Sequence, residues 1–290
     1  MLTKGRFNEI GAFVSESQII SSDGYLEICK RIPSVLYTKR DFLFIEGTWR
    51  NVYVESALRS VKSNQIKHIV VGHSDISTTR VDLLRAYFME GIQSISGVNV
   101  NGYKTRLNTF PTGVTPLEPK SPIHTILSES KHFLRARSST ELDHKYQGNF
   151  YANFSTRNNV RVRKPLVNLL ESLGGRVRIE EPAYTEKGRI NNLRRAREST
   201  FTLCPEGNGV DTHRLWETLY MGGTPVVVKN RRCFSLYSQF PIVILDSWDQ
   251  LLDKDLMCKL WHQLDDFEWD TAKLSLSYWA ERIKQISQAL

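Results

Sequence analysis

The chain has 290 residues, of which 40% are hydrophobic and 24% are charged. These fractions are normal for a globular protein and allow a sizeable core. The 39 Lys and Arg residues exceed the 31 Asp and Glu residues and give a net charge of +8, which suits an anionic partner. Because the positive charges are dispersed, with small clusters at 157–164 and 187–197, they favour a local anion site over a nucleic-acid-binding stripe.

Cysteine spacing and hydropathy argue against a secreted or membrane protein. The four cysteines form no CxxC pair, so we interpret them as reduced thiols in the cytosol. Residues 1–17 lack the apolar region of a signal peptide. No apolar run approaches the roughly 20 residues that cross a bilayer. We therefore expect a soluble, cytoplasmic protein without a transmembrane segment.

Apolar strand patterns and amphipathic helix patterns alternate along the first half of the chain. Strands are predicted at 34–39, 41–47 and 67–75, and helices at 53–62 and 80–92. Residues 99–122 are rich in Gly, Pro and Thr and are predicted to form loops. A polar segment over 138–149 then marks the predicted domain boundary.

The alternation restarts in the second half. Strands are predicted at 149–155, 176–181, 200–207, 224–230 and 241–246, and helices at 160–173, 186–199, 211–222, 247–264 and 273–290. This order is typical of α/β proteins with parallel sheets. We predict two βαβ domains, 1–145 and 146–272, that meet at a cleft, and a C-terminal helix over 273–290. Open parallel sheets bind ligands beyond the carboxyl ends of their strands.

The segment CPEGNGVDTHRLWETLYMGGTPVVVKN, residues 204–230, joins a strand, a glycine-containing turn, a helix and a second strand. Gly207 and Gly209 allow the backbone of the turn to approach a ligand closely. Asp211 or Thr212 can cap the helix. The N-terminus of a helix attracts anions such as phosphate.

Two charged residues follow on the same face of that helix. Arg214 lies in the first turn and can bind a diphosphate through its planar fork of donors. Glu217 lies three residues later, and its carboxylate can accept hydrogen bonds from sugar hydroxyls. The same residues also fit a capped core helix with an Arg–Glu pair on its surface, so helix chemistry alone leaves both interpretations open.

The stretch CPEGNGVDTHRLWETLYMGGTPVV resembles the donor-binding motif of exostosin-like (GT47-type) glycosyltransferases. In that family, Cys-Pro and a turn with Gly lead to a helix with His-Arg-x-x-Glu, followed by Gly-x-x-Pro-Val-Val. The motif covers about a tenth of the chain and is similar to that of small members from microbes and large DNA viruses. The resemblance implies the GT-B fold: two Rossmann-like domains facing a cleft, the first binding the acceptor and the second the nucleotide sugar. It also implies that the helix at 273–290 packs back on the first domain.

The resemblance also implies the roles of single residues. Glu217 would contact the ribose, and Arg214 a phosphate. The rim around the sugar and the diphosphate would be formed by Gly207, Gly209, Asp211, Thr212 and His213. YANFSTRNNVRVRKPL, residues 151–166, resembles the opening strand and helix of such a donor domain. Its candidates for the diphosphate are Ser155 and either Arg161 or Arg163.

The first half must supply the acceptor chemistry. His73 and Asp75 follow a strand with a buried pattern, at the carboxyl end that faces the predicted cleft. Inverting sugar transfer needs a general base for the acceptor hydroxyl. Asp75 is the first candidate and His73 the second, although an Asp after a strand is commonly a turn or capping residue.

Metal binding has little support in the sequence. Asp253 and Asp255 form a D-x-D pattern inside a predicted helix, where their side chains would point about 200° apart. No His/Cys cluster indicates zinc. We expect no cofactor and no metal, with the helix dipole and the arginines stabilising the leaving diphosphate instead.

The leading interpretation is an inverting glycosyltransferase that moves a sugar from a UDP-sugar, with a pentose such as xylose among the candidates, to a hydroxyl of a glycan acceptor. A GDP-fucose-type transferase is the alternative enzyme. That type carries Glu-Lys-Leu-Trp where this chain has residues 212–216, THRLW. A non-catalytic nucleotide- or RNA-binding module is the alternative outside enzymes, but the aromatic and basic pattern of RNA-binding sheets is missing. We therefore expect a nucleotide sugar and a glycan, and no nucleic acid, as partners.

Overall fold

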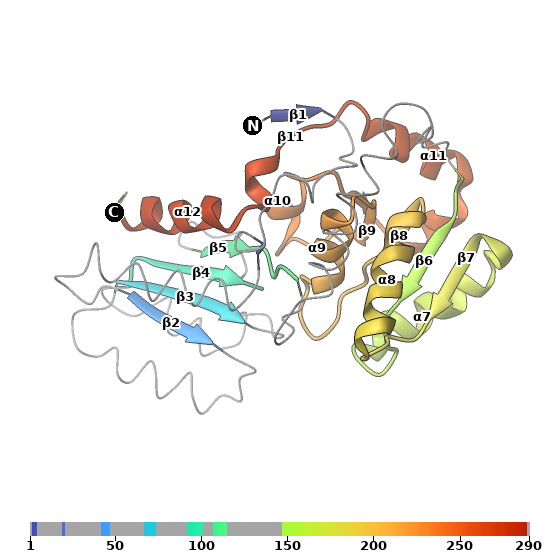
Figure 1. The fold of residues 1–290 in the computed structure, drawn as a ribbon, viewed down its shortest axis with the longest axis horizontal. Helices are drawn as coiled ribbons and strands as arrows, with labels where there is room; N and C mark the ends of the chain where they lie inside the picture. The colour runs from blue at the N-terminus through green and yellow to red at the C-terminus, as the bar shows by residue number, and fades with distance from the viewer. Residues whose placement is uncertain are drawn as a thin grey trace.

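The computed structural model describes residues 2–4, 19–20, 42–46, 67–73, 92–100, 107–114 and 147–288. Within these residues the protein is an α/β structure with two parallel sheets and helices, consistent with a Rossmann-like fold (Figure 1). The predicted α/β class is therefore confirmed. The predicted strand at 34–39, the helix at 53–62 and all but the last residue of the helix at 80–92 lie outside the described residues.

The first sheet has four parallel strands in chain order: β2 (Phe42–Glu46), β3 (His68–His73), β4 (Ser94–Val98) and β5 (Leu107–Phe110). The predictions at 41–47 and 67–75 are confirmed. No strand was predicted at β4, and β5 falls within the predicted loop, so that prediction was wrong. β4 is buried along its whole length. Its Ser and Gly residues interrupt the apolar run by which a buried central strand is predicted from sequence.

The second sheet has five parallel strands in the order β10-β9-β8-β6-β7. They are β6 (Phe150–Asn153), β7 (Val177–Glu180), β8 (Phe201–Leu203), β9 (Pro225–Val228) and β10 (Val243–Leu245). All five match predicted strands. Counted along the chain, the order is 2-1-3-4-5, a doubly wound arrangement that changes direction between β6 and β8. The carboxyl ends of β6 and β8 therefore form the switch point where such sheets bind ligands.

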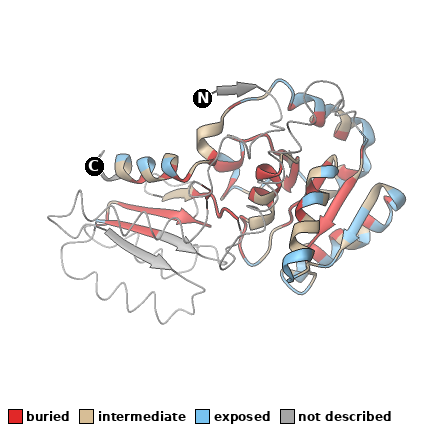
Figure 2. Cartoon of the chain, in the orientation of Figure 1, coloured by how far each residue is buried: buried red, intermediate tan, exposed pale blue. Residues whose placement is uncertain are grey.

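Helices cover both faces of the second sheet. The helices α7 (Val160–Glu171) and α11 (Lys254–Gln263) share one apolar cluster with β6, β8 and β9. On the opposite face, α8 (Glu186–Glu198) and α9 (His213–Tyr220) contribute to a second cluster. Figure 2 shows β6 buried between these layers and the outer strand β7 more exposed.

The helix predicted over 247–264 is two helices. A short helix, η3 (Trp248–Leu252), ends before α11, and Asp253 separates them. Its carboxylate accepts a hydrogen bond from the Leu256 N–H at 2.9 Å and so caps α11. Shorter elements complete this half: η2 (Gly174–Arg176), α10 (Phe234–Tyr237), β11 (Glu268–Asp270) and η4 (Thr271–Leu274).

The two ends of the chain meet the rest of the molecule in different ways. The helix α12 (Leu276–Gln288) lies along the first sheet, where the rings of Trp279 and Phe110 are 5.3 Å apart (Figure 1). The strand β1 (Leu2–Lys4) pairs antiparallel with β11. The apolar cluster that contains α9 also contains residues of β4, β5 and α12. The two sheets thus share one core.

Candidate functional site

The carboxyl ends of β6 and β8 are linked by a buried arginine. Arg163, on α7, is only 6% exposed. Its guanidinium donates to three carbonyl oxygens: Nε to Glu206 at 2.9 Å, Nη1 to Ser155 at 3.0 Å and Nη2 to Pro205 at 3.3 Å. Arg163 therefore fixes the loop after β6 against the loop after β8. The hydroxyl of Ser155 accepts the Arg157 N–H at 3.2 Å.

A second arginine approaches the switch point from the opposite face of the sheet. Arg214, in the first turn of α9, donates from Nη2 to Asn153 Oδ1 at 2.8 Å. Asn153 is the last residue of β6, and its Nδ2 donates to the Glu181 carbonyl at 3.2 Å. Burial and the positive charge of Arg214 lower the pKa of Arg163 to about 10. Arg163 is therefore still charged at neutral pH, and two guanidinium groups lie close together.

The loop between β8 and α9 is shaped by its glycines. The Gly207 N–H donates to the Gly209 carbonyl at 3.0 Å. A Cβ at Gly207 would lie 2.9 Å from Arg163 Nη2, and a Cβ at Gly209 would collide with the amide of Asn99. A side chain at either position would have to displace Arg163 or Asn99, so the constraint comes from close packing and not from a left-handed backbone.

The helix α9 begins without a side-chain cap. Thr212 is the N-cap residue, but its hydroxyl makes no capping hydrogen bond. Its Oγ1 is buried and has no hydrogen-bond partner among the described residues. The first N–H groups of a helix have no partner within the helix. A buried, unsatisfied hydroxyl beside them is a polar position that a bound anion can use.

Glu217 lies one turn after Arg214 and is half-buried. Both charges act on the thiol of Cys204, at the end of β8. Burial raises the pKa of Cys204 to about 12, the Arg214 charge opposes this rise, and the Glu217 charge adds to it. The two side chains predicted to contact a donor therefore lie around the same strand end.

A cavity of about 440 Å³ opens beside this strand end. It lies between the first turns of α7, the ends of β8 and β9, and the start of η3. Its walls are mostly apolar, with one cation from the exposed Arg161 and carboxylates from Glu206, Asp246 and Asp249. The other lining residues are Val162, Pro165, Leu166, Leu169, Cys204, Val210, Val227, Val228, Tyr237, Ser247 and Trp248. The volume is in the range of small-molecule sites.

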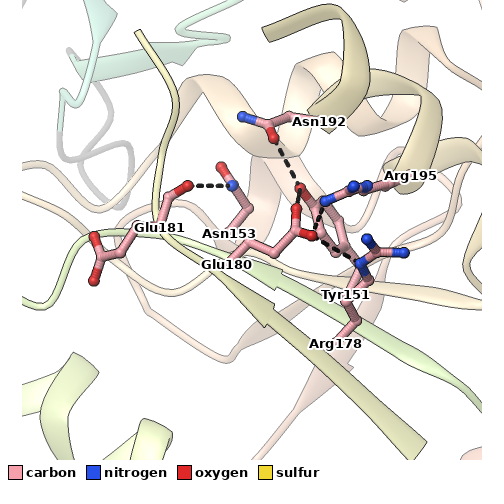
Figure 3. A network of polar contacts seen from close by, with 7 residues as sticks. All are labelled: Tyr151, Asn153, Arg178, Glu180, Glu181, Asn192 and Arg195. Atoms are coloured by element: carbon pink, nitrogen blue, oxygen red, sulfur yellow. Dashed lines mark hydrogen bonds and ion pairs between the residues drawn. The ribbon is translucent and has the colours of Figure 1, made fainter. Parts of the chain in front are cut away.

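The β6 strand is held in place by a polar network on the α8 face, which Figure 3 shows. The hydroxyl of the buried Tyr151 donates to Glu180 at 3.1 Å and to Asn192 at 3.2 Å. Glu180 also pairs with Arg195 and, at 2.8 Å, with Arg178. The network ties β6 to β7 and α8, and so supports the strand that presents Asn153 at the switch point.

Asp211 and His213, two predicted rim residues, contact the first half of the chain. The Asp211 carboxylate is 3% exposed and accepts the Thr112 N–H at 2.7 Å. His213 Nδ1 lies 2.9 Å from the Gly113 carbonyl. The other predicted residues of the segment 204–217 lie in the loop between β8 and α9 or in the first turns of α9. Arg163 contacts this loop through two backbone carbonyls.

The described residues include only part of the catalytic candidates in the first half. His73 is the last residue of β3, and its side chain lies outside the described part of the molecule. Asp75 lies outside the described residues altogether. The neighbouring strand β4 ends just before Asn99, which contacts the loop between β8 and α9. The carboxyl edge of the first sheet thus adjoins that loop.

Two further features concern metal and membrane. Within residues 147–288 and the shorter described segments, no three His, Cys, Asp or Glu side chains gather as a metal site would require. No helix in the described part of the chain is long and apolar enough to cross a membrane. Of the D-x-D pair, Asp253 caps α11 and Asp255 is exposed in its first turn.

Asn153, Glu206 and Asn99 were not singled out in the sequence. Asn153 ends a strand that is otherwise apolar and aromatic, so a polar residue at a buried strand end was the available signal. Glu206 contributes its carbonyl to Arg163, and backbone contacts leave no signal in the residue type. Asn99 lay within the predicted loop region.

No protein-family model matches the chain, and no curated protein matches it either.

Proposed function

We propose that this chain is a glycosyltransferase that moves a sugar from a nucleotide sugar to a hydroxyl of a glycan acceptor. The observation that carries the proposal is the meeting of two guanidinium groups with the N-terminus of α9 at the switch point of the second sheet. Such a site suits a diphosphate, because the helix terminus and both arginines favour negative charge. The exostosin-like motif over 204–227 supports a sugar nucleotide as its source.

The donor-binding roles follow from how each side chain is placed. Arg214 is half-buried in the first turn of the uncapped helix α9, and we assign it to the diphosphate. Arg163 donates its hydrogen bonds to three backbone carbonyl oxygens, so it orders the loop behind the ligand. Glu217 accepts the hydroxyls of the ribose. The cavity bordered by Arg161 gives room for the uncharged part of the donor.

The acceptor side lies across the junction between the sheets. In the reaction, a base takes the proton of the acceptor hydroxyl as its oxygen attacks the anomeric carbon, and the bond from that carbon to the diphosphate breaks. Asp75 is the first candidate for this base and His73 the second. Support comes from the end of β3, which shares its edge with Asn99 and thus with the donor loop.

A GT-B arrangement accounts for both sheets and for α12. The first sheet then carries the acceptor and the second the donor, while α12 crosses to the first sheet. We also propose that the enzyme needs no metal, because the dipole of α9 and the arginines neutralise the departing diphosphate. UDP is the proposed nucleotide.

A thermal-shift screen with UDP-sugars, GDP-sugars and oligonucleotides tests the proposal. A rise in melting temperature with UDP and UDP-sugars supports it, because ligands that bind the native state stabilise it. A response to GDP-sugars alone favours the fucosyl type instead. A response to oligonucleotides without any response to nucleotide sugars overturns the enzyme assignment.

A further inference from the structure

The first turn of α9 is held by residues from the first half of the chain. Asn99, which follows β4, is 3% exposed and has a left-handed backbone with φ 56°. Few residues other than glycine adopt this conformation, although Asn tolerates it. Its Oδ1 accepts the Asp211 N–H at 2.8 Å. The end of β4 thus contacts the loop between β8 and α9.

The carboxylate of Asp211 joins three parts of the molecule. It accepts the Thr112 N–H at 2.7 Å, the Trp216 Nε1–H at 2.9 Å and the Tyr237 hydroxyl at 3.0 Å. Thr112 follows β5, Trp216 belongs to α9, and Tyr237 belongs to α10. A carboxylate with this many donors at less than a tenth exposure is in a structural position and faces no ligand.

A further contact lies on the other side of Thr212. His213, the first residue of α9, lies with Nδ1 2.9 Å from the carbonyl of Gly113. Gly113 has φ 72°, and a Cβ there would collide with the Ile20 carbonyl. The backbone of Gly113 is therefore closely packed. Residues 211 and 213 bracket the N-cap of α9, and both are held by the loop after β5.

We propose that Asp211 is a positioning residue, which, with Asn99 and the loop 112–113, orients the first turn of α9 so that Arg214 and the helix N-terminus face the anion. In this role Asp211 never touches the ligand. The anion site on the second sheet is then complete only when the first sheet is docked against it. The role rests on the proposed function for the identity of the anion, but not for the geometry of the junction.

Two variants disturb the junction from opposite sides. Asp211→Asn keeps the size of the side chain but puts an NH₂ group against donors, so one of the three hydrogen bonds is lost. Asn99→Gly keeps the left-handed backbone and removes the amide that binds the Asp211 N–H. Leu264→Ala is the control, because Leu264 is buried on the α7 and α11 face of the sheet, away from the junction.

The experiment is a calorimetric titration of inorganic pyrophosphate into the full chain and the three variants. The indole N–H resonance of Trp216 and the melting temperature are measured for each protein. We expect Asp211→Asn to shift the Trp216 resonance and to weaken pyrophosphate binding about tenfold or more. Asn99→Gly should weaken binding in the same direction. Leu264→Ala should lower the melting temperature and leave the affinity unchanged.

The outcomes separate this inference from the proposed function. A folded Asp211→Asn protein with a shifted Trp216 resonance and wild-type affinity overturns the positioning role. If Asp211→Asn does not fold, the Asn99→Gly variant is used instead, and wild-type pyrophosphate affinity in a folded Asn99→Gly protein overturns the positioning role. A wild-type chain that binds no pyrophosphate also overturns the role. If the wild type binds pyrophosphate but no nucleotide sugar, the glycosyltransferase assignment fails while the junction result still stands.

Discussion

The carboxyl edges of the two parallel sheets meet at one junction, but they carry different chemistry. The edge of the second sheet brings two guanidinium groups and a helix N-terminus together between β6 and β8. The described edge of the first sheet contributes the neutral Asn99 amide and the backbone of Thr112 and Gly113. One edge is positively charged, and the described part of the other fixes the first in place.

The comparison shows that a polar residue near the carboxyl edge of a parallel sheet has no fixed role. Arg163 and Asp211 both look like ligand contacts in the sequence. In the structure, each is buried and its polar atoms are bonded to protein groups. Arg214 and Glu217, in contrast, are only half-buried. Burial, and not residue type, separates the residues that hold these loops together from those that the proposed function assigns to the ligand.

The largest expected effect is that of replacing Asp75, the first candidate for the base in the first half of the chain. Asp75→Asn should lower kcat by roughly 10²–10⁴-fold, because a general base acts in the chemical step. UDP affinity should barely change, since the donor lies on the second sheet. Steady-state kinetics and calorimetry check both quantities.

His73→Gln is the companion variant for that measurement. If Asp75→Asn keeps most of its kcat while His73→Gln loses it, His73 is the base. If both keep their kcat, the base lies elsewhere in the first half of the chain, and both assignments are wrong.

Arg163→Lys tests whether the second edge is held together by Arg163. Lysine cannot reproduce the bonds to three carbonyl oxygens, so the free energy of unfolding should fall by about 1–3 kcal/mol. Urea denaturation gives this value. Arg161→Lys is the matched control, because Arg161 is exposed on the same helix, and it should change stability by less than about 0.5 kcal/mol. Equal stability of the two variants would count against the loop-fixing role.

Cysteine labelling tests whether the second edge stays closed. Burial raises the pKa of Cys204 to about 12 and also raises that of Cys233, so both remain protonated thiols at pH 8. Iodoacetamide should therefore leave both unmodified in the native protein, while the half-buried Cys258 reacts. Mass spectrometry identifies the modified residues. Rapid labelling of Cys204 would mean that the loop after β8 opens.

The smallest expected effect is that of chelation. If the charged edge alone stabilises the departing diphosphate, turnover should be unchanged in EDTA. A radiochemical transfer assay with and without the chelator measures this. Activity that is lost in EDTA and restored by Mn²⁺ would mean that a cation, and not the pair of arginines, stabilises the departing diphosphate.

The sequence predicts the second sheet well, because four of its strands are short, largely apolar runs between turn signals, and the edge strand β7 alternates apolar and charged residues. It misses β4 and β5, whose Ser, Gly, Asn and Thr residues look like loop residues. The roles of single residues are harder to foresee. Asp211 binds Thr112 and Tyr237, which lie 99 and 26 positions away, so only the folded chain shows that its carboxylate is enclosed. The segment 204–217 is different, because a strand, a turn and a helix place its residues together locally.

The most direct test of the central claim is a calorimetric titration of UDP into the wild-type chain and Glu217→Ala, with Glu198→Ala, an exposed carboxylate on α8, as the control. A donor site at α9 predicts that the wild type and Glu198→Ala bind UDP alike. Glu217→Ala should lose roughly 1.5–3 kcal/mol of binding free energy with its fold intact, because a sugar hydroxyl pair loses a charged acceptor. Unchanged UDP affinity in folded Glu217→Ala would contradict the ribose role, and no UDP binding by the wild type would contradict the site itself.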